Sequence, residues 1–407
     1  MVLFKKIKAS ALQMVLVVAV IIVILLFAFI SLMFYQKRVA IKHANFSESI
    51  YENHQVFEYL KQANIPYGLT DSLDIFQNVS ITKKQWGIFE LISVKTKINK
   101  ESFEQIALIG ERNTNKKALY LKNNNQQLIL VGNTKIIGNT VLPRLGVNSG
   151  NIAGVSYNNK KLIYGSIEQS ETKLPPLKNK EKVLSFLTTY RNDSIAHFGL
   201  EQGMIEHRSF FKKTLSYRRN GVIDIVNSSL IGNIIIESDT LIRVHATSKL
   251  QDVILIAPKI EILKNFTGNI QAFATEKINI GKNSHLAYPS SLLLLDTSNK
   301  GTIHISKAAI IKGVISYLSN SKTANYTSQI LAANKSVIFG EVYCQGNFEL
   351  IGHVNGAVYT NNFIVNKRGG TYVNHLFNGV INSEKLSKQY AGLVFGNSSK
   401  SVAKWLN

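Results

Sequence analysis

Acidic residues, histidines and one cysteine are the side chains of this 407-residue chain that could do chemistry, and their spacing matches no catalytic motif. HExxH, GxSxG, CxxC and GxxxxGK followed by Ser or Thr are all absent. The nine histidines occur singly, and an isolated histidine has a surface or packing role far more often than a metal-binding one. The sequence therefore predicts no catalytic residue, no metal ligand and no cofactor, and a protein that is not an enzyme.

Polysaccharide cleavage is the reaction for which the carboxylates have to be weighed, because it generally needs two of them about 5 to 9.5 Å apart. Residues 277–340 contain only one acid, Asp296. Two pairs could face each other from adjacent turns of a repetitive fold: Glu341 with Glu349, and Asp224 with Glu237. Repetitive β surfaces routinely carry isolated charges, so these acids are expected to be structural.

The single cysteine, Cys344, excludes an internal disulfide framework and a Cys-rich zinc site. It lies in the apolar run VIFGEVYCQG, where a small buried hydrophobic residue is expected rather than a reactive thiol. Apolar residues make up 45% of the chain, which is enough for a substantial core. Stability must therefore come from packing and backbone hydrogen bonds.

The formal net charge of +22 calls for an anionic partner or another physical reason. The partners to consider are lipid headgroups, acidic glycans and nucleic acid. The lysines are dispersed, and no dense basic tract with interleaved aromatic residues occurs, so nucleic acid is disfavoured. The distribution favours lysines that keep exposed β edges soluble and unpaired.

The elements that must position these side chains begin with an apolar segment. Residues 14–30 are apolar without interruption, and a helix over residues 14–35 is long enough to cross a hydrocarbon core of about 30 Å. The aromatic and basic residues at 34–38 are typical of a membrane interface. This favours an uncleaved signal-anchor over a secretory signal peptide, whose apolar region is about 7 to 15 residues, and over a buried core helix. We expect a single-pass anchor that includes Met14, Ile22, Ile30 and Tyr35.

The orientation of this anchor rests on general rules of insertion. Basic residues flank the segment on both sides, so the positive-inside rule alone does not decide. The N-terminal tail is short and basic, and long domains translocate with little regard for their charge. We therefore expect the N-terminus in the cytoplasm of a bacterial-type inner membrane and residues 45–407 on the periplasmic or extracytoplasmic side.

From residue 119, short apolar segments alternate with Asn, Gly, Lys and Thr, many of them at intervals of about 8 to 12 residues. GNTKIIGN (132–139) and GNFELIGH (346–353) even look like copies of each other. Asn-Gly hairpin turns are few, so the pattern favours a right-handed parallel β-helix, whose coils have about 20 residues. Another all-β solenoid or a sandwich remains an alternative. The predicted fold class is mainly β: one N-terminal transmembrane helix, then this solenoid with a helical insertion.

The predicted domain organisation has eight parts. They are a cytoplasmic basic leader (1–13), the transmembrane helix (14–35), a juxtamembrane helix (36–66), a small α/β or β region (67–118), a first β-solenoid block (119–170), a partly helical insertion (171–215), the main β-helix (216–382) and a C-terminal cap (383–407).

The segment KASAL (8–12), followed by the apolar run, resembles the N-terminus of type IV pilin-like proteins, particularly minor pilins and general-secretion pseudopilins. In that family a basic leader is cut after a small residue, and the apolar helix then packs into a filament. The resemblance implies cleavage between Ala9 and Ser10, with Leu12 at a common apolar position. The chain departs from the family pattern at Ala9, where glycine is preferred, and at Met14, where most members carry glutamate.

A second resemblance covers part of the β region. VIFGEVYCQGNFELIGHVNGAVYTNNFIV (337–365) resembles the repeats of polymer-forming bactofilins or of pilin-associated β-helical proteins. A bactofilin-like role implies self-assembly in the cytoplasm, which conflicts with the topology expected above.

These observations together predict a non-enzymatic, membrane-anchored envelope protein whose extracytoplasmic β-helix acts in assembly or adhesion, as a minor component of a pilus-like or type II secretion-like apparatus. The expected partners are the lipid bilayer, other envelope or pilus-like subunits, and acidic glycans. The alternative is a membrane-tethered protein that binds or cleaves polysaccharide along a groove of the β-helix lined by Lys, Tyr, Asn and one or two acids.

Overall fold

We describe a computed structural model of the chain, which is mainly β with one long N-terminal helix, as the sequence predicts. The described residues are 9–63, 65–73, 76–112, 117–189, 195–198, 200–298, 300–319, 326–395 and 399–406. They divide into two compact units. Unit 1 contains residues up to 59 together with 69–81 and 94–104, and unit 2 contains 60–68, 82–93 and 105–407.

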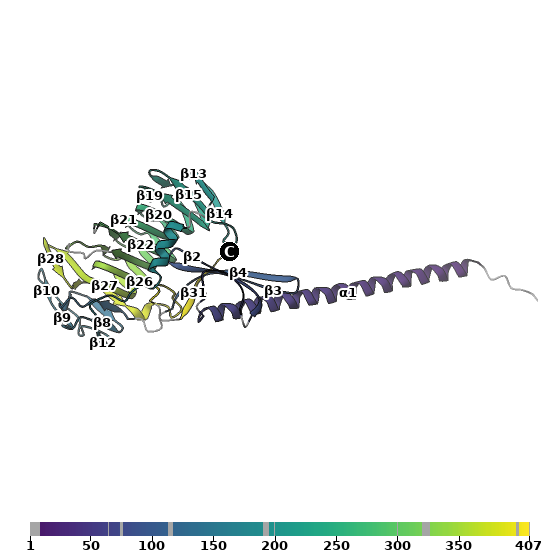
Figure 1. Cartoon of the computed structure of the whole chain (residues 1–407), viewed down its shortest axis with the longest axis horizontal. Helices are drawn as coiled ribbons and strands as arrows, with labels where there is room; N and C mark the ends of the chain where they lie inside the picture. The colour runs from purple at the N-terminus through teal and green to yellow at the C-terminus, as the bar shows by residue number, and fades with distance from the viewer. Residues whose placement is uncertain are drawn as a thin grey trace, which may run out of the picture. The chain divides into compact units, whose positions relative to one another are not determined.

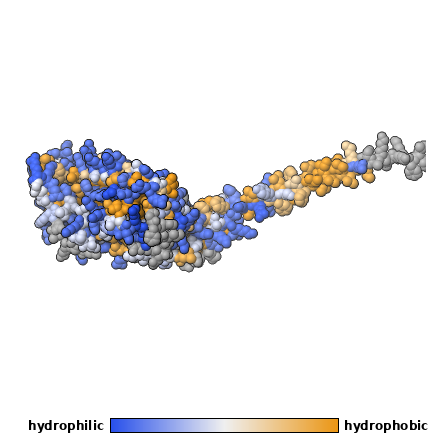
Figure 2. Space-filling view, turned by 90° about the horizontal axis from the view of Figure 1, so that it is seen from above, coloured by the Kyte–Doolittle hydropathy of each residue, from blue (hydrophilic) through white to orange (hydrophobic). Residues whose placement is uncertain are grey.

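The N-terminal helix α1 (Ala9–Leu60) is continuous over 52 residues (Figure 1). Its sequence contains neither glycine nor proline, and it ends six residues before Pro66, which cannot continue a helix. Figure 2 shows an almost continuous apolar surface along the first part of this helix and a largely hydrophilic one along the next. The two parts of α1 are therefore suited to different surroundings.

The last turns of α1 pack within unit 1. Asn53 Nδ2 donates to the backbone oxygen of Val94 at 2.8 Å, and Thr96 Oγ1 donates to the backbone oxygen of Ser49 at 2.7 Å. Asn53, Thr96 and Ser49 are completely buried, so these bonds satisfy polar groups that would otherwise cost free energy. The strands involved belong to a five-stranded sheet with the order β1-β2-β3-β4-β31. Their bounds are β1 (Gly68–Leu73), β2 (Phe76–Trp86), β3 (Phe89–Ile98), β4 (Glu101–Glu111) and β31 (Lys400–Leu406).

Most other strands form a parallel network in unit 2 that closes on itself. The strands up to residue 244 are β5 (Leu119–Leu121), β6 (Leu128–Val131), β7 (Lys135–Ile137), β8 (Thr140–Leu142), β9 (Val147–Ser149), β10 (Asn151–Ile152), β11 (Val155–Ser156), β12 (Ile167–Gln169), β13 (Ile195–Phe198), β14 (Ile205–Arg208), β15 (Leu215–Arg219), β16 (Ile223–Ile225), β17 (Ser229–Gly232), β18 (Ile234–Ser238) and β19 (Leu241–Val244). The strands after them are β20 (Lys249–Ile262), β21 (Thr267–Ile280), β22 (His285–Asp296), β23 (Thr302–Ile305), β24 (Ile310–Ser319), β25 (Ile330–Ala332), β26 (Val337–Leu350), β27 (His353–Lys367), β28 (Gly370–Val373), β29 (His375–Phe377) and β30 (Val380–Asn382). Of these, β10 and β11 form a separate antiparallel pair, β6, β9 and β29 form a separate three-stranded sheet, and β28 pairs antiparallel with β27.

The parallel strand pairings form three ladders, and in each ladder apolar residues of successive strands lie next to one another. The first ladder joins Tyr217, Ile236, Leu255, Ala272, Leu292, Ile315, Val342, Val358 and Leu119 in succession. The second joins Ile223, Ile242, Ile260, Ile278, Ile303, Ile330, Phe348 and Phe363. The third includes Leu286, Ile311, Ile338, Val354, Ile381 and Ile136. These side chains are buried in one cluster, so stacked aliphatic residues form the core.

The block at residues 119–170 stacks on the C-terminal strands of the network. Leu119 in β5 pairs with Val358 in β27, and Lys135 in β7 pairs with Val380 in β30. The ladder then continues through β8 to β12, whereas β13 pairs with β15 at the other end. Figure 1 shows β12 and β13 at opposite ends of the stacked strands. The segment from β12 to β13, which contains helix α2 (Lys180–Thr189), must therefore cross the ladders, and we call residues 171–189 the connector.

The C-terminal segment differs from the end cap expected for residues 383–407. β31 pairs antiparallel with β4, with Trp405 opposite Ala107. Alternate residues of the first ladder point to two different buried clusters: Ile315 belongs to the inner core and Val314 to an outer cluster that includes Leu393. Because the outer side of this ladder is also apolar, it needs cover, and the C-terminal segment supplies part of it.

Candidate functional site

Helix α1 supplies the first candidate functional surface. The predicted anchor residues are exposed, with Met14 at 72%, Ile22 at 50%, Ile30 at 51% and Tyr35 at 67% of their accessible surface. Among the described residues, α1 is the one helix that is long and apolar enough to cross a membrane, with a mean hydropathy of 3.5 in its most apolar window. A continuous apolar surface of this size is unfavourable in water. Ala9 and Ser10 are the first residues of α1, and residues 1–8 of the predicted leader lie outside the described residues.

A groove of about 680 Å³ in unit 2 is the second candidate. Lys122, Lys173 and Lys180 line it, and no carboxylate is among its described lining residues. We call it the lysine groove. The remaining lining residues are Asn124, Thr172, Leu174, Pro176, Leu177, Leu318, Ser319, Tyr343, Gln345, Asn361 and Asn362. They come from the end of β5, from the connector and from the first ladder, so the groove exists only because the block at 119–170 stacks on β27.

Hydrogen bonds fix the amide side chains of the lysine groove. Asn124 Nδ2 donates to the backbone oxygen of Asn361 at 2.8 Å and to Asn362 Oδ1 at 2.5 Å. Asn361 Nδ2 donates to the backbone oxygen of Gln345 at 2.7 Å, and Gln345 Oε1 accepts from the backbone nitrogen of Ser319 at 3.1 Å. The wall of the groove is therefore organised before any ligand arrives.

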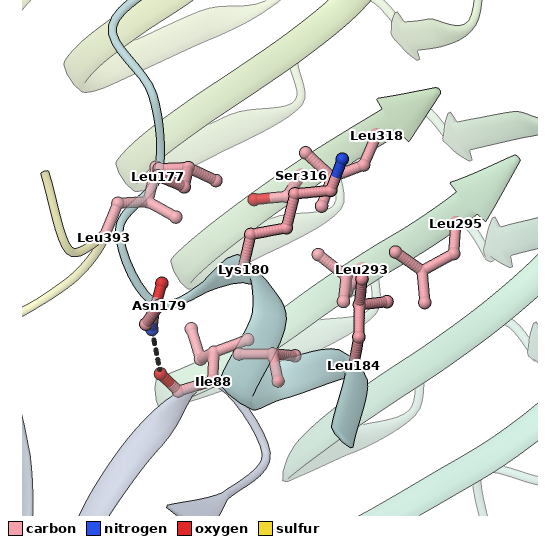
Figure 3. A pocket seen from close by; sticks show the side chains of 11 residues that line it. Ile88, Leu177, Asn179, Lys180, Leu184, Leu293, Leu295, Ser316, Leu318 and Leu393 are labelled. Carbon is pink, nitrogen blue, oxygen red and sulfur yellow. Dashed lines mark hydrogen bonds between the residues drawn. The ribbon is translucent and has the colours of Figure 1, made fainter. Parts of the chain in front are cut away.

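A small cavity lies beneath the connector, beside the lysine groove. Figure 3 shows Leu177 and Leu184 of the connector facing side chains of the first ladder, including Leu293 and Ser316. Asn179 Nδ2 donates to the backbone oxygen of Ile88 at 3.1 Å. The volume is only about 20 Å³, which is close to the space that one water molecule needs. This cavity is a packing feature and not a ligand site.

Within each of the two carboxylate pairs weighed for polysaccharide cleavage, the two acids lie in different ladders. Glu341 lies in the first ladder, opposite Val314, whereas Glu349 lies in the second, opposite Leu331. Asp224 pairs with Arg243 in the second ladder, and Glu237 with Arg218 in the first, at N–O distances of 2.9 Å and 2.7 Å. The two acids of each pair are therefore not opposite each other across adjacent strands.

Asp296 has a structural role in the turn after β22. Its carboxylate accepts from the backbone nitrogens of Ser298 and Gly301, both at 2.7 Å, and from the hydroxyl of Tyr317 at 2.7 Å. Burial alone raises the pKa of this carboxyl group, but these hydrogen bonds outweigh burial and lower the pKa below its ordinary value. The acid is ionised at neutral pH, so it cannot act as a proton donor there.

The described residues contain no group of three or more His, Cys, Asp or Glu side chains that could hold a metal ion. Cys344 is completely buried, and burial raises the pKa of its thiol to about 12. It therefore fits the role of a small core residue that its apolar surroundings predicted.

We expect Cys344 to be inert in the folded protein. At pH 8 its thiolate population is about a thousandfold lower than that of a thiol at the ordinary value of 9, and the sulfur is inaccessible. A maleimide or disulfide reagent should label the chain stoichiometrically in guanidinium and negligibly under native conditions, as read by intact mass. Rapid native labelling would show that β26 is not packed as described.

A buried ion cluster around Glu90 was not predictable from the local sequence pattern. Its Oε1 lies 3.1 Å from Lys83 Nζ and its Oε2 lies 2.7 Å from Lys400 Nζ. The side chain of Lys83 is completely buried, and burial lowers its pKa to about 8 although Glu90 opposes this effect. Burial would raise the pKa of Glu90, but the two lysines outweigh it and lower that pKa. Tyr67 also donates its hydroxyl to Glu90 at 3.1 Å, so the cluster joins four segments.

Comparison with known proteins adds no family to this description. No family model matches the chain, and no match was found among curated proteins or solved structures. The resemblances to pilin-like and bactofilin-type proteins therefore rest on the sequence segments at 8–35 and 337–365 alone.

Proposed function

We propose that this chain is a non-enzymatic, membrane-anchored envelope protein that holds a β-helix outside the cytoplasm, where it acts in assembly or adhesion. The observation that carries this proposal is the apolar part of α1, whose most apolar window is not buried by any other part of the described chain. A bilayer is the surrounding in which such a surface is stable. The N-terminus is then cytoplasmic, and the β-rich remainder lies in the extracytoplasmic space.

The three ladders support the β-helix in this proposal. Each ladder is parallel throughout, and long strands such as β20 and β21 contribute successive residues to all three. A chain that passes repeatedly through three parallel ladders forms coils around a common axis. The right-handed form agrees with the preferred hand of parallel connections. The helical insertion of this solenoid is then the connector with α2.

The assembly role rests on the continuous helix and on the carboxylates. α1 continues without a break from its exposed apolar part to a buried part at Ser49, Asn53 and Phe57. A continuous helix of this kind would hold the β-rich remainder rigidly at a membrane, as an assembly subunit requires. The N-terminal resemblance favours a minor component of a pilus-like or type II secretion-like apparatus, with processing after Ala9. The acids examined are engaged in hydrogen bonds or ion pairs, which disfavours polysaccharide cleavage.

The test of anchoring uses the full chain with charges placed in the span. Ile22→Arg combined with Leu26→Arg should move the protein from the carbonate-resistant membrane fraction to the soluble fraction, because each arginine costs about 2.5 to 3.5 kcal/mol at the centre of a membrane helix. The matched control, Ile22→Leu with Leu26→Ile, should stay in the membrane.

Protease added to the outside of spheroplasts distinguishes the two orientations. It should degrade the β-rich remainder of the wild-type chain. Retention of the arginine variant in the membrane, or full protection of residues 45–407, would contradict the proposal.

A further inference from the structure

We propose that the lysine groove binds an acidic polysaccharide, a hydroxyl-rich polymer that carries carboxylate or phosphate groups. This inference goes beyond the anchoring role and does not depend on α1. It starts from the charges: three lysines from two distant segments line one concavity without a carboxylate among the described lining residues. Lys122 and Lys173 also form no ion pair within the described part of the chain. The nearest acid in sequence, Glu171, is exposed and does not line the groove.

The polar wall of the groove fits the hydroxyl groups of a sugar chain. Asn124 and Asn361 use their Nδ2 groups in the bonds described above, while no described residue donates to either Oδ1. These two oxygens and the Thr172 hydroxyl are available to hydroxyl groups of a ligand. Because Asn124 and Asn361 are held in place, little side-chain freedom is lost when a ligand binds.

The lining also distinguishes a polysaccharide from single-stranded nucleic acid. Proteins that bind single strands place bases on exposed aromatic rings. Tyr343, the one aromatic residue among the described lining residues, is 1% exposed, and its hydroxyl donates to the backbone oxygen of Pro175 at 3.0 Å. The described lining thus offers no ring for stacking. It also contains no carboxylate to serve as the acid and base of glycoside hydrolysis, so we expect a ligand that is bound and not cleaved.

The experiment measures binding of the full chain, held in neutral detergent micelles, to defined polymers at 50 and 300 mM salt. Polygalacturonate supplies carboxylates and a phosphate-substituted dextran supplies phosphates, so the two arms identify the anion. Dextran is the neutral comparison. We expect saturable binding to one acidic polymer, weakened by salt, with no change in polymer length on incubation.

The decisive variant is Lys122→Gln/Lys173→Gln/Lys180→Gln, which should weaken binding about tenfold or more, because it removes the three positive charges of the described lining. The matched control is Lys264→Gln/Lys282→Gln/Lys307→Gln, which removes the same charge from exposed turns outside the groove and should leave binding unchanged. Equal losses in both variants would assign binding to dispersed surface charge and overturn the proposal.

A second variant keeps the test valid if the triple substitution does not fold. Thr172→Glu adds a carboxylate at an exposed position of the lining and should also weaken binding, whereas Thr172→Gln should not. No binding to either acidic polymer, or tighter binding to a single-stranded oligonucleotide of equal charge, would refute the inference. Neither result would bear on anchoring, which the fractionation experiment tests separately.

Discussion

Gly340→Ala is expected to lower the free energy of unfolding of the β-rich unit by about 4 kcal/mol. A Cβ atom at this position would lie 1.8 Å from the backbone oxygen of Gly313 in the adjacent strand. Gly340 also has a φ of +153°, which side chains with a Cβ rarely adopt. Gly356 in β27 approaches the backbone of Gly340 equally closely. The strand that contains Gly340 therefore cannot move away from Gly313 without meeting the backbone of β27. Thermal unfolding followed by circular dichroism in detergent measures the effect.

Gly146→Ala is the matched control for this substitution. Gly146 also has a positive φ, of 70°, but its Cβ would meet no atom within 4 Å. The control carries only the cost of the backbone conformation, about 1 to 2 kcal/mol. If the two substitutions prove equally mild, the close stacking of glycine on glycine between β24, β26 and β27 is wrong.

Glu90→Gln is expected to destabilise unit 2 by about 3 to 5 kcal/mol, because it removes the one carboxylate that faces two lysines. Of the two lysines, Lys83 contributes more to this loss, because its side chain has no exposure to water and its ammonium group would be left buried without a carboxylate. Chemical unfolding at pH 7 measures the loss. Glu168→Gln removes the partner of Lys117, but the side chain of Glu168 is 54% exposed, and we expect a change within about 0.5 kcal/mol.

The pH dependence of the Glu90→Gln variant is a further readout of the same prediction. Lys83 has a folded pKa of about 8 and an unfolded value of 10.5, so in the wild type stability rises with pH between these values. Without Glu90 the folded pKa of Lys83 falls further, and the rise begins below pH 8. Glu90 itself has a lowered pKa, so its contribution is present above about 4.5 and is lost as the pH falls through its folded value. A variant whose stability stays flat from pH 7 to 9 would exclude a buried ammonium group.

Local patterns in the sequence predict the element types well. Seventeen unbroken apolar residues predict the helix, and short aliphatic segments such as KINIG and TIHIS predict strands, because burial on a strand needs only alternate residues. The stacking order was not predictable in the same way. Segments such as GNTKIIGN and GNFELIGH are nearly interchangeable, so nothing local shows that β5 pairs with β27.

The candidate sites depend on that stacking order. Asn124 and Asn361 are far apart in sequence, and they meet only because β5 follows β27 in the first ladder. The ion cluster depends on a different long-range arrangement, since Lys400 lies in β31, which joins the five-stranded sheet that contains Lys83 and Glu90. Period-two alternation also does not show which ladder a residue joins: Glu341 and Glu349 lie on the same strand, β26, but pair with different strands, β24 and β25.

The placement of β5 also has a consequence for biosynthesis. The ribosome makes residues 119–170 early, and β5 can pair with β8 within this block, yet the other edges of β5 and β7 find their partners only when β27 and β30 have been synthesised. Growth of the stack from β13 toward β27 can proceed in step with synthesis, while the earlier block waits with open strand edges. A nascent chain stalled before residue 353 should therefore be prone to aggregation and should depend on a chaperone, whereas release of the finished chain lets the last join form.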